Sequence, residues 1–222
     1  MPTRKRSATP KRRAKTRRKY RTGAIRQRNY QKIIEAAEEE FVRHGYRGTS
    51  IQSIARRADL PKANVHYYFR NKDTLYRAVL DNILHLWNAF LDDITVADEP
   101  RVVLAEFIRK KMELSYRRPS ASKLFAMEII QGAPHLGQYL RTDMRRWLNA
   151  KTKVMSVWMR RGKMAKTDPT LLIFLIWAAT QHYADFDAQV LPLLKRRAYH
   201  DAIVAHVSDF LTRVILTGVG VR

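Results

Sequence analysis

The sequence contains no cysteine, so disulfide bonds and metal sites built on thiolates are excluded. It lacks any run of about 18 apolar residues, the length that a membrane-spanning helix requires. Its N-terminus has no apolar segment of the kind that a signal peptide carries. We therefore predict a cytoplasmic protein with no membrane partner.

Acidic residues are absent before Glu35, and the chain begins with a strongly basic segment. Residues 1–28 hold 13 Lys and Arg, out of a net charge of +23 for the 222 residues. This surplus favours a polyanionic partner, because binding releases counterions and long-range attraction steers association. A basic tail that only aids solubility is the alternative. Residues 1–25 are poor in apolar residues, and we expect a disordered basic arm that wraps a nucleic-acid backbone or enters its minor groove.

The rest of the chain shows a succession of helical patterns, with no alternating strand pattern and no repeat of fixed period. An apolar stripe begins near Gln27 and ends at His44-Gly45, where the glycine favours a helix C-terminus. Polar residues that can cap the second and fourth helices are Thr49 or Ser50, and Asn71. The fourth helix continues to about residue 90. Longer helices are then predicted over residues 100–117, 119–132, 136–163, 168–189 and 197–217. The predicted fold class is all-α.

The predicted helix at 168–189 has no polar face over the nine residues 171–179. We expect it to be buried on nearly all sides. In a two-layer domain such a helix needs a further packing surface, and a second subunit would supply it. The last helix, at 197–217, is a second candidate for that contact. The sequence therefore predicts a homodimer, with packing inside one chain as the alternative.

The segment 49–72 predicts two short helices joined by a tight turn, followed at once by the start of a third. In the second short helix Val65 and Phe69 are apolar anchors, whereas the side chains between them have no reason to be buried. This arrangement suits a helix that rests on a small core and presents side chains to a DNA groove.

These residues resemble the helix-turn-helix of the TetR-type repressors, whose usual run is close to T-S-x-x-x-I-A-x-x-A-G-V-S-x-x-x-L-Y-Y-Y-F-x-x-K. The matching positions are Thr49, Ser50, Ile54, Ala55, Ala58, Tyr67, Phe69 and Lys72. Asp59 replaces the usual turn glycine, Pro61 the capping Ser, and His66 a Tyr that commonly contacts phosphate. Asp tolerates a left-handed turn better than most residues, and Pro is acceptable where the first-turn N–H needs no partner.

The resemblance implies an N-terminal three-helix DNA-binding domain at residues 26–72 and a larger helical effector-binding and dimerisation domain at residues 73–222. Base-edge contacts are implied for Lys62, Ala63 and Asn64, since Lys can address guanine, Asn the adenine edge, and Ala a thymine methyl. Phosphate contacts are predicted for a second group, Thr49, Ser50, Gln52, His66, Tyr67 and Lys72. For each residue taken singly, an ordinary solvated helix surface is the alternative.

The second half of the chain is similar to regulators of pyrimidine utilisation in the same family, over residues 124–128, 132–134 and 176–186. This similarity implies an effector pocket for uracil, thymine or a related pyrimidine metabolite, held by Trp177 and Gln181. An indole can stack on a planar ring, and a carboxamide offers both a donor and an acceptor. Residues four apart share one helix face. A core Trp with a hydrogen-bonded Gln is the alternative.

We therefore predict a ligand-responsive transcriptional repressor of a pyrimidine-related catabolic pathway, which binds double-stranded operator DNA. The alternatives are a TetR-type regulator of an unrelated effector, such as an efflux or stress ligand, and a constitutive basic architectural DNA-binding protein. An enzyme is disfavoured, because the sequence has no nucleophile–base spacing, phosphate-binding Gly loop or paired carboxylates. His182 and Asp185 could ligate a metal but lack a third ligand, so no catalytic residue, metal or cofactor is predicted.

Overall fold

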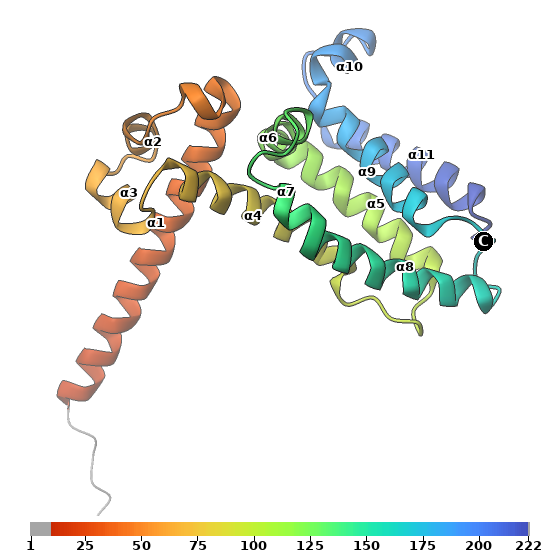
Figure 1. The fold of residues 1–222 in the computed structure, drawn as a ribbon, viewed down its shortest axis with the longest axis horizontal. Coiled ribbons are helices and arrows are strands. Elements are labelled where there is room, and N and C mark those ends of the chain that lie inside the picture. Colours follow the sequence, from red (N-terminus) through yellow and green to blue (C-terminus); the bar gives the residue numbers. More distant parts are fainter. Residues whose placement is uncertain (1–9, 222) are drawn as a thin grey trace, which may run out of the picture. The chain divides into compact units, whose positions relative to one another are not determined.

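The computed structural model describes residues 10–221, and every regular element in that range is helical. The all-α prediction is confirmed. Two compact units divide the chain, Met1–Tyr76 and Arg77–Arg222. Their boundary falls inside α4, Lys72–Asp92, four residues beyond the predicted end of the DNA-binding domain (Figure 1). None of the helices in the described range combines the length and the apolar character that a membrane span needs.

The first unit contains α1 (Pro10–Gly48), α2 (Ile51–Arg57), α3 (Lys62–Tyr68) and the first residues of α4. Gly45 interrupts α1 with φ 67° and ψ 172°, a conformation that glycine adopts without steric cost. The regular helix therefore ends where the His44-Gly45 pair predicted. The arm predicted at residues 1–25 overlaps this helix: residues 1–9 lie outside the described range, and α1 begins at Pro10. Disorder of the arm without a partner stays a prediction.

Both predicted helix caps are present. The Ser50 hydroxyl accepts the Ser53 N–H at 3.0 Å, and the Ser53 hydroxyl accepts the Ser50 N–H at 3.2 Å, so each satisfies a backbone donor of the other. At the start of α4, Asn71 Oδ1 accepts the Thr74 N–H at 2.8 Å. Asp59 adopts φ 53° in the turn between α2 and α3, the left-handed conformation that the sequence predicted there.

The turn between α1 and α2 is held by two polar side chains. Lys72 Nζ donates to the carbonyls of Tyr46 at 2.7 Å and Thr49 at 2.9 Å, and it lies 4.6 Å from the centroid of the Tyr46 ring. Thr49 is buried, with its hydroxyl 2.8 Å from the Gly45 carbonyl and 3.0 Å from that of Glu40. These bonds satisfy carbonyl groups that the break at Gly45 leaves without helical partners.

An ion pair links α2 to α1. Arg57 Nε lies 2.6 Å from Glu40 Oε1, and Arg57 Nη1 lies 2.8 Å from Glu39 Oε2. Burial by itself would raise the pKa of Glu40, but the hydrogen bond from Arg57 holds that pKa below its ordinary value. The pair therefore fixes the position of α2 against the first helix.

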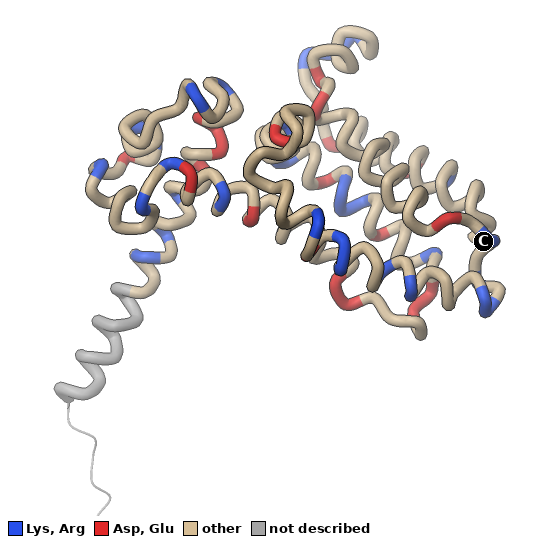
Figure 2. Tube along the Cα trace, in the orientation of Figure 1, with Lys and Arg blue, Asp and Glu red and all other residues tan. Residues whose placement is uncertain are grey.

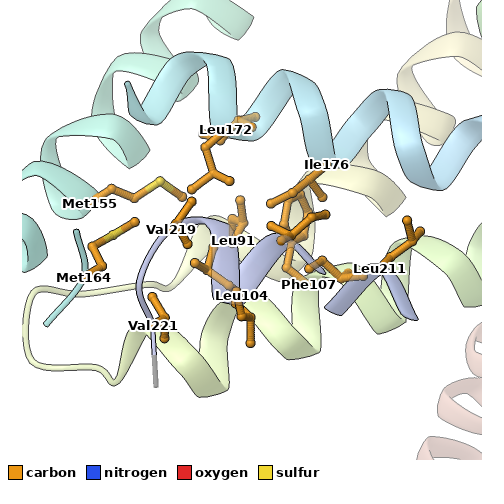
Figure 3. Packing of buried hydrophobic residues seen from close by; sticks show 14 of the residues in the cluster. Leu91, Leu104, Phe107, Met155, Met164, Leu172, Ile176, Leu211, Val219 and Val221 are labelled. Carbon is orange, nitrogen blue, oxygen red and sulfur yellow. The ribbon is translucent and has the colours of Figure 1, made fainter. Parts of the chain in front are cut away.

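The second unit continues α4 and adds α5 (Pro100–Arg117), α6 (Pro119–Ile130), α7 (Gly137–Tyr139), a π-helical segment (Leu140–Met144), α8 (Arg145–Arg160), α9 (Pro169–Asp185), α10 (Asp187–Leu193) and α11 (Asp201–Gly218). Helix α5 packs against α6, α9 and α11. These helices share with α4 and α8 a core of apolar side chains, as Figure 3 shows for residues such as Leu91, Phe107, Met155, Ile176 and Leu211.

Three predicted helices differ from the observed ones by three or more residues at one end, whereas α6 ends two residues before its predicted end. The range 136–163 contains α7, the π-helical segment and α8, which ends at Arg160. The range 168–189 is broken at Phe186 (φ −118°, ψ 32°), whose carbonyl accepts the N–H groups of Gln189 and Val190 and so starts α10. The last helix begins at Asp201, not at residue 197. Apolar periodicity missed the break because apolar residues continue across it.

Replacing Lys72 by Met should destabilise the protein by about 1–3 kcal/mol, because carbonyls of the turn between α1 and α2 lose their donor. Urea unfolding of the full chain, followed by circular dichroism, measures this change. Lys62→Met, at an exposed lysine of α3, is the control and should change stability by less than about 0.5 kcal/mol. Equal stability of Lys72→Met and the wild type would contradict this structural role.

Candidate DNA-binding and effector sites

Burial of two apolar residues orients α3. Val65 and the following Phe69 are buried in the core of the first unit. Because these residues lie four apart on one face, the residues between and before them face outward. Exposed side chains on this helix are Lys62, Ala63, His66 and Tyr67, and Asn64 is half-buried. Tyr67 is 69% exposed, which is unusual for so large an aromatic side chain and favours a contact with a partner.

Aromatic contacts join the end of α3 to α1. The Tyr68 hydroxyl donates to the Arg26 carbonyl at 3.1 Å, and the Tyr30 ring centroid lies 5.4 Å from that of Phe69. The Arg26 guanidinium carbon lies 5.8 Å from the centroid of the Tyr67 ring. The structure therefore places a residue of the basic N-terminal segment beside a predicted phosphate contact. Sequence analysis did not predict a DNA contact for Arg26 in particular. Its place in the basic N-terminal segment was the one feature that could have indicated such a contact.

The start of α2 presents two of the predicted phosphate contacts. Ser50 and Gln52 are exposed, and α2 packs directly against α3. Neither helix contains an acidic residue, so their polar surface offers donors and positive charge (Figure 2). The side chains of Thr49 and Lys72 instead contact carbonyls of their own chain. Phosphate contacts by these two residues stay predictions, and sequence analysis missed their structural contacts.

Trp177 and Gln181, the predicted effector contacts, are both half-buried on α9. The Trp177 ring centroid lies 6.3 Å from that of Trp147 on α8, with 26° between the planes, and 5.5 Å from that of Phe174. Trp147 Nε1 donates to Asp92 Oδ1 at 2.7 Å, which fixes that indole. Trp177 is thus part of an aromatic cluster. The sequence could not show Trp147 as its neighbour, because the two residues come from different helices.

An apolar cavity of about 10 Å³ lies between α5, α9 and α11, with room for about one water molecule. Its lining includes Met112, Tyr183, Tyr199 and Val207, but neither Trp177 nor Gln181. Within the part of the chain that the structure describes, the buried Tyr199 hydroxyl has no hydrogen-bond partner, and burial raises the pKa of Tyr199 to about 12. This cavity is too small for a pyrimidine ring.

Two family models match the chain. Residues 33–79 match the model described as bacterial regulatory proteins of the tetR family. Residues 80–222 match the model described as the C-terminal region of YcdC-like protein. The first of these descriptions is of regulatory proteins.

Individual proteins agree with the family models. The HTH-type transcriptional regulator RutR of Escherichia coli K12 is 38% identical over 190 residues, which cover 86% of this chain and 90% of RutR. A solved structure of AibR with isovaleryl coenzyme A and operator DNA has a TM-score of 0.63 at 19% identity, over 84% of this chain and 97% of AibR. FadR from Bacillus subtilis, solved with stearoyl-CoA, has a TM-score of 0.61 at 18% identity, over 86% of this chain and 99% of FadR. These two structures show the shared fold, and the family models with RutR show that the chain belongs to the TetR family of DNA-binding transcriptional regulators.

Proposed function

We propose that this regulator is a cytoplasmic homodimer that represses a pyrimidine-related catabolic pathway and releases its operator when a pyrimidine binds. The observation that carries the DNA-binding part is the outward face of α3, which is polar and aromatic while Val65 and Phe69 are buried beneath it. A helix of this kind reads base edges in the major groove.

Within this proposal the outward-facing residues of α3 form two groups with different contacts. Lys62, Ala63 and Asn64, at the N-terminal end of the helix, face base edges. His66, Tyr67 and the exposed start of α2 contact phosphates, which position the helix without reading sequence. Arg26 beside Tyr67 adds a positive charge to the same surface. Thr49 and Lys72 support this surface through the turn that they hold.

Exposed apolar residues on two helices of the second unit support a homodimer. Helix α9 buries Leu172, Ile173 and Ile176, but its opposite side is open to solvent in the single chain. The exposed fractions lie between 45% and 63% for Leu171, Phe174 and Leu175 of α9 and Phe210 and Val214 of α11. Apolar surface of this extent favours a protein interface. A second copy of the chain would cover α9 on the side that the sequence analysis expected to be buried.

A pyrimidine effector is supported by Trp177 and Gln181, by the similarity to pyrimidine-utilisation regulators and by the identity of 38% to RutR. The half-buried Trp177 ring is held among aromatic neighbours, as a stacking surface would be. Gln181 lies one turn further along the same helix face and can pair with the amide edge of the ring. The coenzyme A complexes of AibR and FadR concern proteins below 20% identity, and they support no acyl effector for this chain.

Asn64→Ala should lower discrimination between operator and random DNA by about 1–3 kcal/mol, if its carboxamide pairs with a base edge. The operator is first selected by the wild-type protein from random-sequence DNA, and both affinities are measured at one salt concentration. Asn149→Ala, at an exposed Asn of α8, is the matched control and should change neither affinity. An unchanged affinity ratio for Asn64→Ala would show that Asn64 reads no base.

Uracil, thymine or one of their breakdown products should release the selected operator in a titration followed by fluorescence anisotropy. Trp177→Ala should raise the concentration for half-release at least tenfold, whereas Trp177→Phe keeps a stacking face and should raise it less. Operator binding that no member of this panel alters would refute the pyrimidine assignment and leave the DNA-binding role intact.

A further inference from the structure

The basic N-terminal segment belongs in part to a helix, and the proposed function leaves most of it without a role. Helix α1 keeps helical backbone angles from Pro10 up to the break at Gly45 (Figure 1). Proline suits the first turn of a helix, because its missing N–H needs no partner there. Ten of the 13 basic residues of the segment lie between Lys11 and Arg28, and no residue before Glu35 is acidic. Such a helix favours a polyanionic partner.

Contacts with α3 show which side of α1 borders the proposed DNA-binding surface. The Arg26 carbonyl accepts the Tyr68 hydroxyl at 3.1 Å, and the Arg26 guanidinium carbon lies 5.8 Å from the centroid of the Tyr67 ring. One turn further on, the Tyr30 ring centroid lies 5.4 Å from that of Phe69. Arg26 and Tyr30 are four residues apart, so they share one helix face. We call this face the α3 side of α1.

The helical repeat by itself assigns the remaining basic positions to two sides of α1. At 3.6 residues per turn, spacings of 7, 11 and 14 residues return to within about 40° of the starting direction. Counted back from Arg26, these spacings give three basic positions on the α3 side: Lys19, Lys15 and Arg12. Three others lie about 140–180° from Arg26, on the opposite side: Arg21, Arg17 and Arg13. The two sets can therefore be compared at equal charge.

The length and composition of this part of α1 favour DNA over a membrane surface. From Pro10 to Arg26 the helix spans about 24 Å at 1.5 Å per residue. This length corresponds to about seven phosphates along one DNA strand. A helix that lies on a membrane needs an apolar face, whereas the large apolar residues of this stretch are only Tyr20 and Ile25.

We propose that α1 binds the DNA backbone beside the operator half-site as a helical extension, and that it does so with its α3 side. Arg26 contacts the first phosphate, and the basic positions before it on the same side contact phosphates of the flanking duplex. These contacts carry no sequence information. Like charges four residues apart disfavour the helix, and because phosphates neutralise them, DNA also stabilises the helical form. This inference rests on the operator binding of the proposed function and is independent of its effector.

Single variants at two exposed arginines test which side of α1 binds. Arg26 is on the α3 side, and Arg28 lies about 160° away from it. Arg26→Gln should weaken binding to the selected operator about three- to tenfold. It should also lower the slope of log K against log salt by about 0.9, the value for one phosphate contact. Arg28→Gln is the matched control and should change affinity less than about twofold.

Two triple variants extend the comparison to the rest of the helix. R12Q/K15Q/K19Q should weaken operator binding at least tenfold and lower the salt slope by about 2–3. R13Q/R17Q/R21Q removes the same charge from the opposite side and should change affinity less than about threefold. Glutamine is chosen because its helix propensity is close to that of Lys and Arg. On an operator trimmed to its half-sites, the two triple variants should bind equally.

Gly23 allows a test of the helix at constant charge. Gly23→Pro interrupts α1 between Lys19 and Arg26 and should weaken binding about as much as the first triple variant. Gly23→Ala favours the helix and should strengthen binding about two- to fivefold. An added Cβ at this position meets no atom of the described residues within 4 Å. Thermal unfolding of each variant checks that the fold is intact.

The outcomes separate this proposal from the proposed function. If both triple variants weaken binding equally, or if Gly23→Pro binds as the wild type does, the segment contacts DNA as a flexible tail and the helical extension is wrong. If neither triple variant changes affinity or salt slope, the segment does not contact DNA. Operator recognition by α3 stands in each of these cases, whereas a wild type that selects no sequence from random DNA would refute it. Should Gly23→Pro fail to fold, Gly23→Ala and the triple variants decide the question.

Discussion

The DNA-binding surface depends on the burial of two side chains, Val65 and Phe69. They hold α3 against the small core of the first unit, and the geometry of the helix then turns Lys62, His66 and Tyr67 outward. Seven residues are too few for a helix that is stable by itself, so α3 exists because its apolar face is packed. The same contact therefore forms the recognition helix and orients it.

Several basic residues outside the N-terminal segment have structural contacts. Basic side chains donate to backbone carbonyls of turns and loops, Lys72 in the first unit and Lys151 in the second. Arg161 and Lys163 donate in the same way to the loop that joins α4 to α5. Charge composition therefore overstates the number of groups available to DNA. Lys111 is more deeply buried than Lys151, and its amine faces the Trp87 ring.

Helix α4 takes part in both units. Lys72 at its start holds the turn before α2, and Trp87 near its end contacts Lys111. An effector that binds the second unit changes operator affinity only if it binds the DNA-free and DNA-bound states with different affinity.

Local features were readable from the sequence alone. These features depend on neighbours a few residues away, and they include the caps at Ser50 and Asn71, the left-handed Asp59 and the helix-turn-helix. The all-α class was predicted in the same way, from the spacing of apolar residues along the chain. Contacts between distant residues were decided only by the tertiary structure. The roles of Lys72 and Thr49, the stacking of Trp147 on Trp177 and the burial of Lys111 arise where helices pack, and the type of a residue does not reveal which carbonyl or ring it will meet. The residue type alone does not show whether a lysine contacts DNA, donates to the carbonyls of a turn or has a buried amine. The packing of the helices decides among these roles.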